Sequence, residues 1–174
     1  TLADSLVDAG DVTAPAVSGL AAIGFAGPLV VSRCTVVGTV ATRELTLGEN
    51  SLFLGRVLAE RRQQGCVRFS FVPAGSRVPR RHRCQPVLPP GISAAEAEQR
   101  TARVRPRFTS LAYGHPAYGQ LDRRTAAEIL RGADDESEMG VYQRLRTPQR
   151  EDALRIRLDE YLPVGLEAGI FYAT

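Results

Sequence analysis

The stretch SRCTVVGTV at residues 32–40 returns at residues 49–57 as ENSLFLGRV. Both copies carry apolar residues in the fifth, sixth and ninth places and a glycine in the seventh. An earlier copy, DSLVDA at residues 4–9, resembles NSLFLG at residues 50–55 but precedes the next copy by a longer interval. Blocks that return at a near-constant interval are typical of a solenoid, whose coils stack on one another.

The repeat also predicts which side chains lie above one another. When the sequence is moved along itself so that Ser32 falls on Glu49, three pairs of residues are aligned and predicted to stack. This offset is called the repeat shift below. These pairs are Val36 with Phe53, Val40 with Val57, and Cys34 with Ser51. The two apolar pairs are expected to form inward rows. Because Cys34 falls on another small residue, we interpret it as a small inward or corner residue.

Residues 29–72 are rich in β-branched and apolar residues, in short runs separated by turn residues. Hairpin strands are normally longer and alternate more regularly, so short bent runs favour a coil around a narrow core. We therefore predict a mainly β fold, with a parallel β-helix over residues 1–72 and a Gly-, Ala- and Pro-rich loop inserted at residues 10–28. An ordinary antiparallel sandwich is the competing interpretation.

Prolines and glycines after Val72 indicate an extended, Arg-rich connection. Three helices are expected beyond it, at residues 93–104, 125–132 and 148–165. Ser93 with Glu96, and Thr125 with Glu128, have the spacing of a capping box at a helix start. These patterns predict a mixed helical region in the second half of the chain.

The third of these helices would place Leu154, Leu158 and Leu162 on one face. The open end of a solenoid exposes unpaired strand edges and apolar core, which proteins cover. We therefore predict that residues 73–174 form a cap over that end, with the third helix packed on the end of the coils or on a neighbouring copy. The apolar tail at residues 170–172 is expected to add to the same surface or to an interface.

All 22 basic residues are Arg, and residues 56–107 hold twelve of them with only three acids. Such a segment suits nucleic acid or phosphate, but no aromatic residues alternate with the Arg to stack on bases. We predict instead that these Arg pair with acids inside the chain or across an interface, and that nucleic acid is not a partner. The residues of this predicted pairing are Arg77, Arg80, Arg81, Arg83, Asp134, Asp135, Glu136 and Glu138.

Cys66 and Cys84 flank the Arg-rich connection, and a disulfide between them would tie the cap to the last coil. The odd total of three Cys and the lack of a visible secretory signal favour reduced thiols instead. Zinc on Cys66, His82 and Cys84 would lack a fourth ligand, and the acids at residues 134–138 lack the spacing of an EF-hand loop. We therefore expect no metal and no cofactor.

Catalytic patterns are also missing. A polysaccharide-processing β-helix needs carboxylates that project together from adjacent coils, yet the repeat shift places Glu44 over Arg61 and Glu49 over Ser32. His115 precedes Pro116 in a turn, and the chain has no nucleophile motif to accompany it. The sequence predicts no catalytic residue in this segment.

Several long segments carry a resemblance that runs over nearly the whole chain, among them GFAGPLVVSRCTVVGTV, RRQQGCVRFSFVPAGSRVPRRHRCQP, RVRPRFTSLAYGHPAYGQL, AEILRGADDESEMGVY and REDALRIRLDEYLPVGLEAGIF. Together they resemble the C-terminal part of a family of large, largely uncharacterised bacterial proteins. The resemblance implies a right-handed β-helix and an association with phage-tail-like contractile injection systems. It supplies no catalytic residues.

The function expected on these grounds is that of a structural or interaction module in, or accessory to, such a particle. Its partners would be other proteins, a second copy, or upstream coils of the same protein, without a membrane. The alternative is a carbohydrate-active β-helix whose groove lies on upstream coils. No basic segment followed by an apolar stretch opens this segment, so we expect a cytoplasmic or particle-associated protein.

Overall fold

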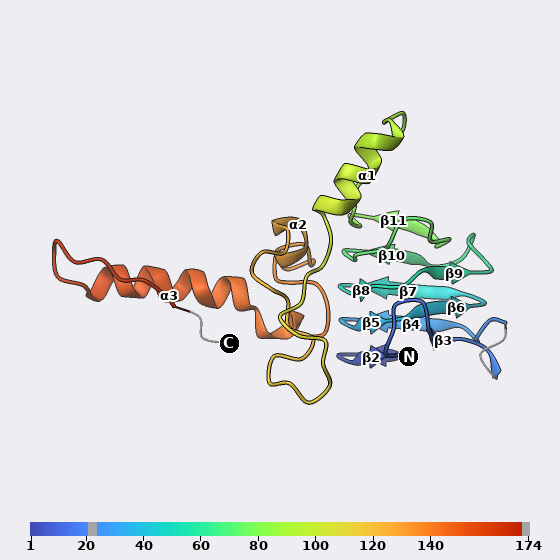
Figure 1. The fold of residues 1–174 in the computed structure, drawn as a ribbon, viewed down its shortest axis with the longest axis horizontal. Coiled ribbons are helices and arrows are strands. Elements are labelled where there is room, and N and C mark those ends of the chain that lie inside the picture. The colour runs from blue at the N-terminus through green and yellow to red at the C-terminus, as the bar shows by residue number, and fades with distance from the viewer. Residues whose placement is uncertain (21–23, 172–174) are drawn as a thin grey trace.

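Parallel strands stacked one above another form the larger part of the protein in a computed structural model that describes residues 1–20 and 24–171 (Figure 1). The first sheet has the order β1 (Leu2–Ala3), β4 (Leu29–Ser32), β7 (Leu45–Glu49), β10 (Cys66–Arg68) and β11 (Arg80–His82). The second sheet is β2 (Leu6–Asp8), β5 (Thr35–Val37) and β8 (Leu52–Phe53), and the third is β3 (Pro15–Val17), β6 (Thr39–Thr42) and β9 (Val57–Ala59). One pass through the three sheets is called a coil below.

Strand register confirms the repeat. Val36 pairs with Phe53 and Val40 with Val57, as the repeat shift predicted. Val7 pairs with Val36, which confirms the longer interval from the first coil to the second. All pairs between named strands are parallel, so the antiparallel sandwich is wrong.

The main core lies inside the coils, between the three sheets. Its fully buried side chains are Val31, Cys34, Val36, Leu45, Phe53, Val57, Val67 and Val72. Burial of a Val, Leu or Phe side chain contributes roughly 1.5–3 kcal/mol. The inward row of the second sheet therefore stabilises several coils at once, as the repeat predicted.

One corner of the coils repeats with the same backbone conformation. The residue that follows each strand of the first sheet has a φ between 48° and 52°, in the left-handed region, at Asp4, Arg33, Asn50, Phe69 and Arg83. The next residue is always small and donates its hydroxyl or thiol to the carbonyl two residues earlier, at Ser5, Cys34, Ser51, Ser70 and Cys84. These side-chain bonds brace a turn that L-residues rarely adopt, and they confirm Cys34 as a small inward residue over Ser51.

The coils extend further than the sequence indicated. Residues 73–85 were predicted to be an extended connection, but β11 pairs with β10, and the backbone of Gln85 binds that of Ser70 and Val72. The predicted boundary at Val72 is therefore wrong in structural terms, because the chain begins another coil there. The predicted loop at residues 10–28 also contains β3, which pairs with β6.

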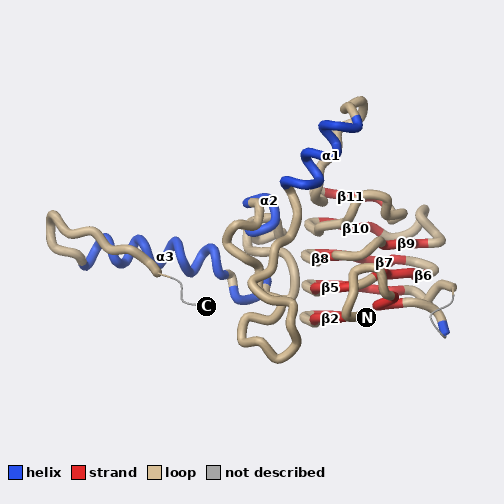
Figure 2. The backbone as a smooth tube through the Cα atoms, viewed as in Figure 1, coloured by secondary structure: helices blue, strands red, loops and turns tan. Residues whose placement is uncertain are grey.

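Most of the region after β11 lies beside the coils, while its first helix extends past β11, beyond the last coil (Figure 2). It comprises α1 (Ala94–Arg103), α2 (Ala127–Leu130), the short 3-10 helix η2 (Gln143–Leu145) and α3 (Thr147–Tyr161). A second core joins it to the outer face of the second sheet, where Leu52 and Phe71 pack with Val104, Ile129 and Met139. The predicted cap over the open end is therefore wrong for the part of the segment after α1, which covers a side wall.

The helix starts differ from one another. Ser93 and Glu96 form the predicted capping box of α1. Thr125 does not cap α2, whose N-cap is Ala126, because the Thr125 hydroxyl instead bonds both the N–H and the carbonyl of Arg107. Local spacing thus predicted the cap of α1. In α2 the predicted cap residue instead bonds to a distant part of the chain.

The predicted packing of α3 on the end of the coils is also wrong, while its packing on a neighbouring copy stays a prediction. The helix points away from the coils in Figure 1, and none of its residues is buried. Leu154 is exposed, and Leu158 and Leu162 are only half-buried. Tyr172, in the predicted apolar tail, lies outside the described residues, and no described helix is long and apolar enough to cross a membrane.

Candidate interaction surfaces

A large apolar groove, called the lateral groove below, lies between α1 and the outer face of the second sheet. It has a volume of about 680 Å³. Its apolar wall is formed by Val12, Leu54, Phe71, Pro73, Leu88, Ala97, Phe108 and Leu111. The only acid among the described lining residues is Glu98. A groove of this size and character is suited to apolar side chains of a partner.

Three elements position the lateral groove. Phe71 occupies the outward row of the second sheet, directly above Leu52, because side chains alternate between the two faces of a strand. Phe108 is fixed by the antiparallel bridge to Leu121. The helix α1 forms the remaining wall and is held at its end by the ion pair of Arg103 with Glu128 at 2.5 Å.

Hydrogen bonds hold the segment after α1 against the coils. The Tyr118 hydroxyl donates to the Asp8 carboxylate, which raises the pKa of Tyr118 to about 12. The Gly140 N–H donates to the Asn50 carbonyl at 2.8 Å, and the Val141 N–H donates to the Thr35 hydroxyl at 3.2 Å. These bonds attach the segment to several coils.

The predicted charge pairing is not found within one chain. Among the described residues, no ion pair joins Arg77, Arg80, Arg81 or Arg83 to the acids at 134–138. Coil geometry accounts for this, because β11 and its neighbours lie at the last coil whereas the acidic turn packs beside Asn50 in the third. Pairing across an interface stays a prediction.

The four acids have other surroundings. Asp134 bonds the side chain of Asn50, and Asp135 accepts from Ser137 and pairs with Arg146 at 3.4 Å. Glu136 is exposed, with a φ of 61°. The acidic turn is thus used mainly to build local structure.

Glu138 differs from the other three, since its side chain is only 8% exposed. Burial, and secondarily the charge of Glu151, raises the pKa of Glu138 to about 7. It lines a cavity of about 230 Å³ together with Arg123, Arg131, Glu151 and Arg155. The cavity lies at the start of α3.

The Arg cluster instead occupies the free edge of the stack. Arg80, Arg81 and His82 form β11, the outermost strand of the first sheet, and all three are exposed. Charged side chains on an edge strand oppose unwanted pairing with other strands. Arg83 lies over the Phe69 ring, 5.8 Å from its centroid, while His82 packs edge-on against the same ring at 5.6 Å.

The three Cys are free thiols, so the disulfide between Cys66 and Cys84 is not formed. Cys66 pairs in the sheet with Arg80, whereas Cys84 lies further along its coil, in the row of Cys34, Ser51 and Ser70. Burial raises the pKa of the Cys34 and Cys84 thiols. Both therefore act as small core residues.

Two carboxylates on the coils, Asp4 and Glu49, are paired with neighbouring Arg. Arg33 bonds Asp4 at 2.6 Å and lowers the pKa of that carboxyl, and Arg68 bonds Glu49 at 2.6 Å. Glu49 also accepts from Ser32 at 2.9 Å, which confirms their predicted stacking. Within residues 1–20 and 24–171, no group of three or more His, Cys, Asp and Glu side chains is arranged to hold a metal.

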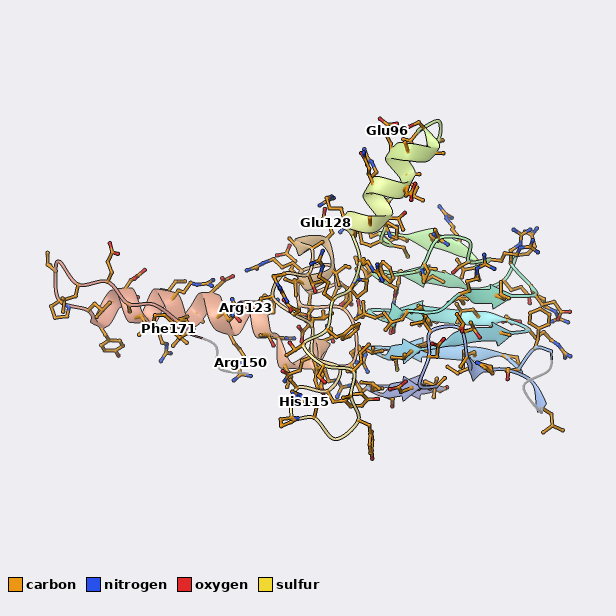
Figure 3. All side chains as sticks on the ribbon, viewed as in Figure 1. Glu96, His115, Arg123, Glu128, Arg150 and Phe171 are labelled. Carbon is orange, nitrogen blue, oxygen red and sulfur yellow. The ribbon has the colours of Figure 1, made fainter. Side chains whose placement is uncertain are left out.

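A projecting arm, made of α3 and residues 162–171, forms the other unusual surface. Its base is fixed by the double hydrogen bond of Arg123 to Glu151, at 2.7 and 2.8 Å, and by Arg131 to Asp152 at 2.7 Å. Figure 3 shows Phe171 alongside α3, far from the coils. The arm's large apolar side chains that are at least 61% exposed are Ile156, Tyr161, Val164, Leu166 and Phe171.

Sequence reasoning missed the lateral groove. Its wall combines Phe71, Phe108 and Ala97, which lie on three separate elements with no shared motif. The repeat gave no signal for Phe71, because Phe71 follows its partner Leu52 at a longer interval than the repeat shift. Comparison of the chain with protein-family models, with curated proteins and with solved structures gave no match.

Proposed function

We propose that the chain is a structural or interaction module, the terminal part of a right-handed parallel β-helix. Parallel connections within one sheet are right-handed in about 98% of cases, and each of the first three coils returns to the first sheet through two further strands. The module would be a component of, or accessory to, a phage-tail-like contractile particle, as the sequence resemblance implies.

The lateral groove is the observation that carries this proposal. Monomeric proteins rarely leave a large contiguous apolar surface uncovered, and such patches mark contacts with partners. Its walls lack the paired carboxylates that glycoside chemistry requires. Two acids on the coil surface, Asp4 and Glu49, are bonded to Arg, which favours assembly over a carbohydrate-active site on these coils.

The test is to express the tagged full chain in the bacterium that encodes it, to sediment its contractile particles and to probe the pellet. We expect the chain in the pellet, and loss of most of it for Leu111→Asp, which places a charge on the groove wall. The matched control is Leu20→Asp, since Leu20 is 96% exposed and does not line the groove. A chain that stays in the supernatant and cleaves polysaccharide would overturn the proposal.

A further inference from the structure

The chain carries two unpartnered apolar surfaces that differ in shape. The lateral groove is a hollow of about 680 Å³. The projecting arm is a rod whose distal half exposes Tyr161, Val164, Leu166 and Phe171. Exposed apolar side chains in such number are unfavourable in water and are normally covered by a partner.

Charge distinguishes the two surfaces in a complementary way. Residues 73–111, which form the last coils, α1 and one wall of the groove, hold eight Arg and only two Glu. Residues 156–171, the distal half of the arm, hold one Arg and three acids, Asp159, Glu160 and Glu167. Opposite potentials favour the encounter of two surfaces and fix their orientation.

The arm is held at its base and unpartnered at its tip. Arg123 and Arg131 attach its first turns to the body through Glu151 and Asp152. Beyond Asp152, the remaining ion pairs of the described α3 residues are those of Arg155 with the same two acids. A fixed base presents the apolar tip at a defined place, which lowers the entropy lost when it binds.

We propose that the projecting arm of one copy docks in the lateral groove of a second copy. Tyr161, Val164, Leu166 and Phe171 fill the apolar hollow, and Asp159, Glu160 and Glu167 face the Arg of the last coils and α1. This inference rests on the proposed function, because it names the partner of the groove as another copy of the same chain. The arm and the groove are different surfaces of the chain. Two copies close into a dimer when each arm enters the other's groove; otherwise further copies add one after another into a longer assembly.

Two double variants of the chain test the arm and the groove independently. Val164→Asp with Phe171→Asp changes the arm and leaves the groove intact, while Leu88→Asp with Leu111→Asp changes the groove and leaves the arm intact. Each altered side chain is at least 40% exposed, so the fold should tolerate it. Leu20→Asp is the control, and circular dichroism checks that each variant is folded.

Sedimentation velocity over a range of concentrations measures the association. Wild type and Leu20→Asp should associate, and each double variant should weaken association at least tenfold. A one-to-one mixture of the two double variants should regain a heterodimer, because one intact arm then meets one intact groove. Raising the salt from about 0.05 to 0.5 M should weaken wild-type association, since screening shortens the reach of the charges.

A wild-type chain that stays monomeric at its solubility limit would overturn the inference. So would association that neither double variant weakens, or a mixture that stays monomeric. The proposed function can be judged separately from the self-association. If the chain is monomeric but sediments with particles, and Leu111→Asp prevents this, the groove binds a different protein and only the self-association is wrong.

Discussion

Asn50 and Asp134, which are far apart in the chain, exchange two hydrogen bonds. The Asn50 Nδ2 donates to Asp134 Oδ1 at 2.8 Å, and the Asp134 backbone N–H donates to Asn50 Oδ1 at 3.1 Å. Asn50 is also a corner residue with a φ of 49°. The backbone of Asn50 thus forms a corner of the third coil, and its side chain attaches the acidic turn to that coil.

Replacement of Asn50 should therefore destabilise the fold in two ways. Asn50→Ala removes both hydrogen bonds and places a Cβ in the left-handed region without a polar group to stabilise it, so we expect a loss of about 2–4 kcal/mol. Asn50→Gly removes the same bonds and relieves the backbone, and it should lose about 1 kcal/mol less. Urea denaturation measures both. Equal stability of the two variants and the wild type would show that the contact contributes nothing.

Phe53 tests the inward row of the second sheet. Its side chain is fully buried and packs within the main core, so Phe53→Ala should leave a cavity and cost about 3–5 kcal/mol. Phe25→Ala is the matched control because Phe25 is 43% exposed, and it should cost less than about 1 kcal/mol. Similar losses for both, by chemical denaturation, would place Phe53 outside the core.

Gly55 tests the close approach of successive coils at another corner. A Cβ at this position would overlap the carbonyl oxygens of Gly38 and Val12. Backbone atoms cannot move away cheaply, so Gly55→Ala should cost about 3 kcal/mol or more. Gly27→Ala meets no heavy atom within 4 Å and serves as the control. A stable Gly55→Ala protein would mean that the coils do not stack at this corner.

Glu138 should make stability depend on pH. Its pKa is about 7 in the folded protein against 4.5 for an unperturbed carboxyl, so the folded state holds the proton more tightly. Stability should fall by about 3 kcal/mol as pH rises from 4.5 to 7, because the folded state must then release the proton or bury the charge. The groups around the carboxyl are Glu151, Arg123, Arg131 and Arg155.

The variant Glu138→Gln checks this dependence. It keeps the shape of the side chain and has no proton to release, so the free energy of unfolding should change less between pH 5 and pH 8 than in the wild type. Glu167→Gln, at an exposed position of the arm, should behave as the wild type. Parallel pH curves for Glu138→Gln and the wild type would show that Glu138 is not buried as described.

The coil region could be predicted from the sequence because its geometry repeats. Val36 and Phe53 must both point inward and Gly38 and Gly55 must both fit a crowded corner, so the same residue types return at the same interval. The last coils escaped prediction because their intervals change. Cys66 follows its partner Leu47 at a longer interval than Phe53 follows Val36, and it precedes its partner Arg80 at a shorter one. An edge strand can also be wholly polar, as β11 is.

The placement of the helical region could not be predicted, for a different reason. A helix pattern such as that of Leu154 and Leu158 shows which residues share a face, but not whether a surface lies opposite that face. Here the outer wall of the second sheet, at Leu52 and Phe71, is covered by Ile129 of the short helix α2 and by Met139, which follows it in a bend of the chain. Because these residues, and not α3, pack on the outer wall, the lateral groove and the projecting arm are left exposed.

The central claim is that the chain winds into parallel coils with one strand of each sheet per turn. A crystal structure of the full chain tests it most directly. Thr35, Leu52 and Phe71 should form one outward row, each strand about 4.8 Å from the next, with right-handed connections between coils. Antiparallel pairing of residues 35–37 with 52–53, or left-handed connections, would contradict the account.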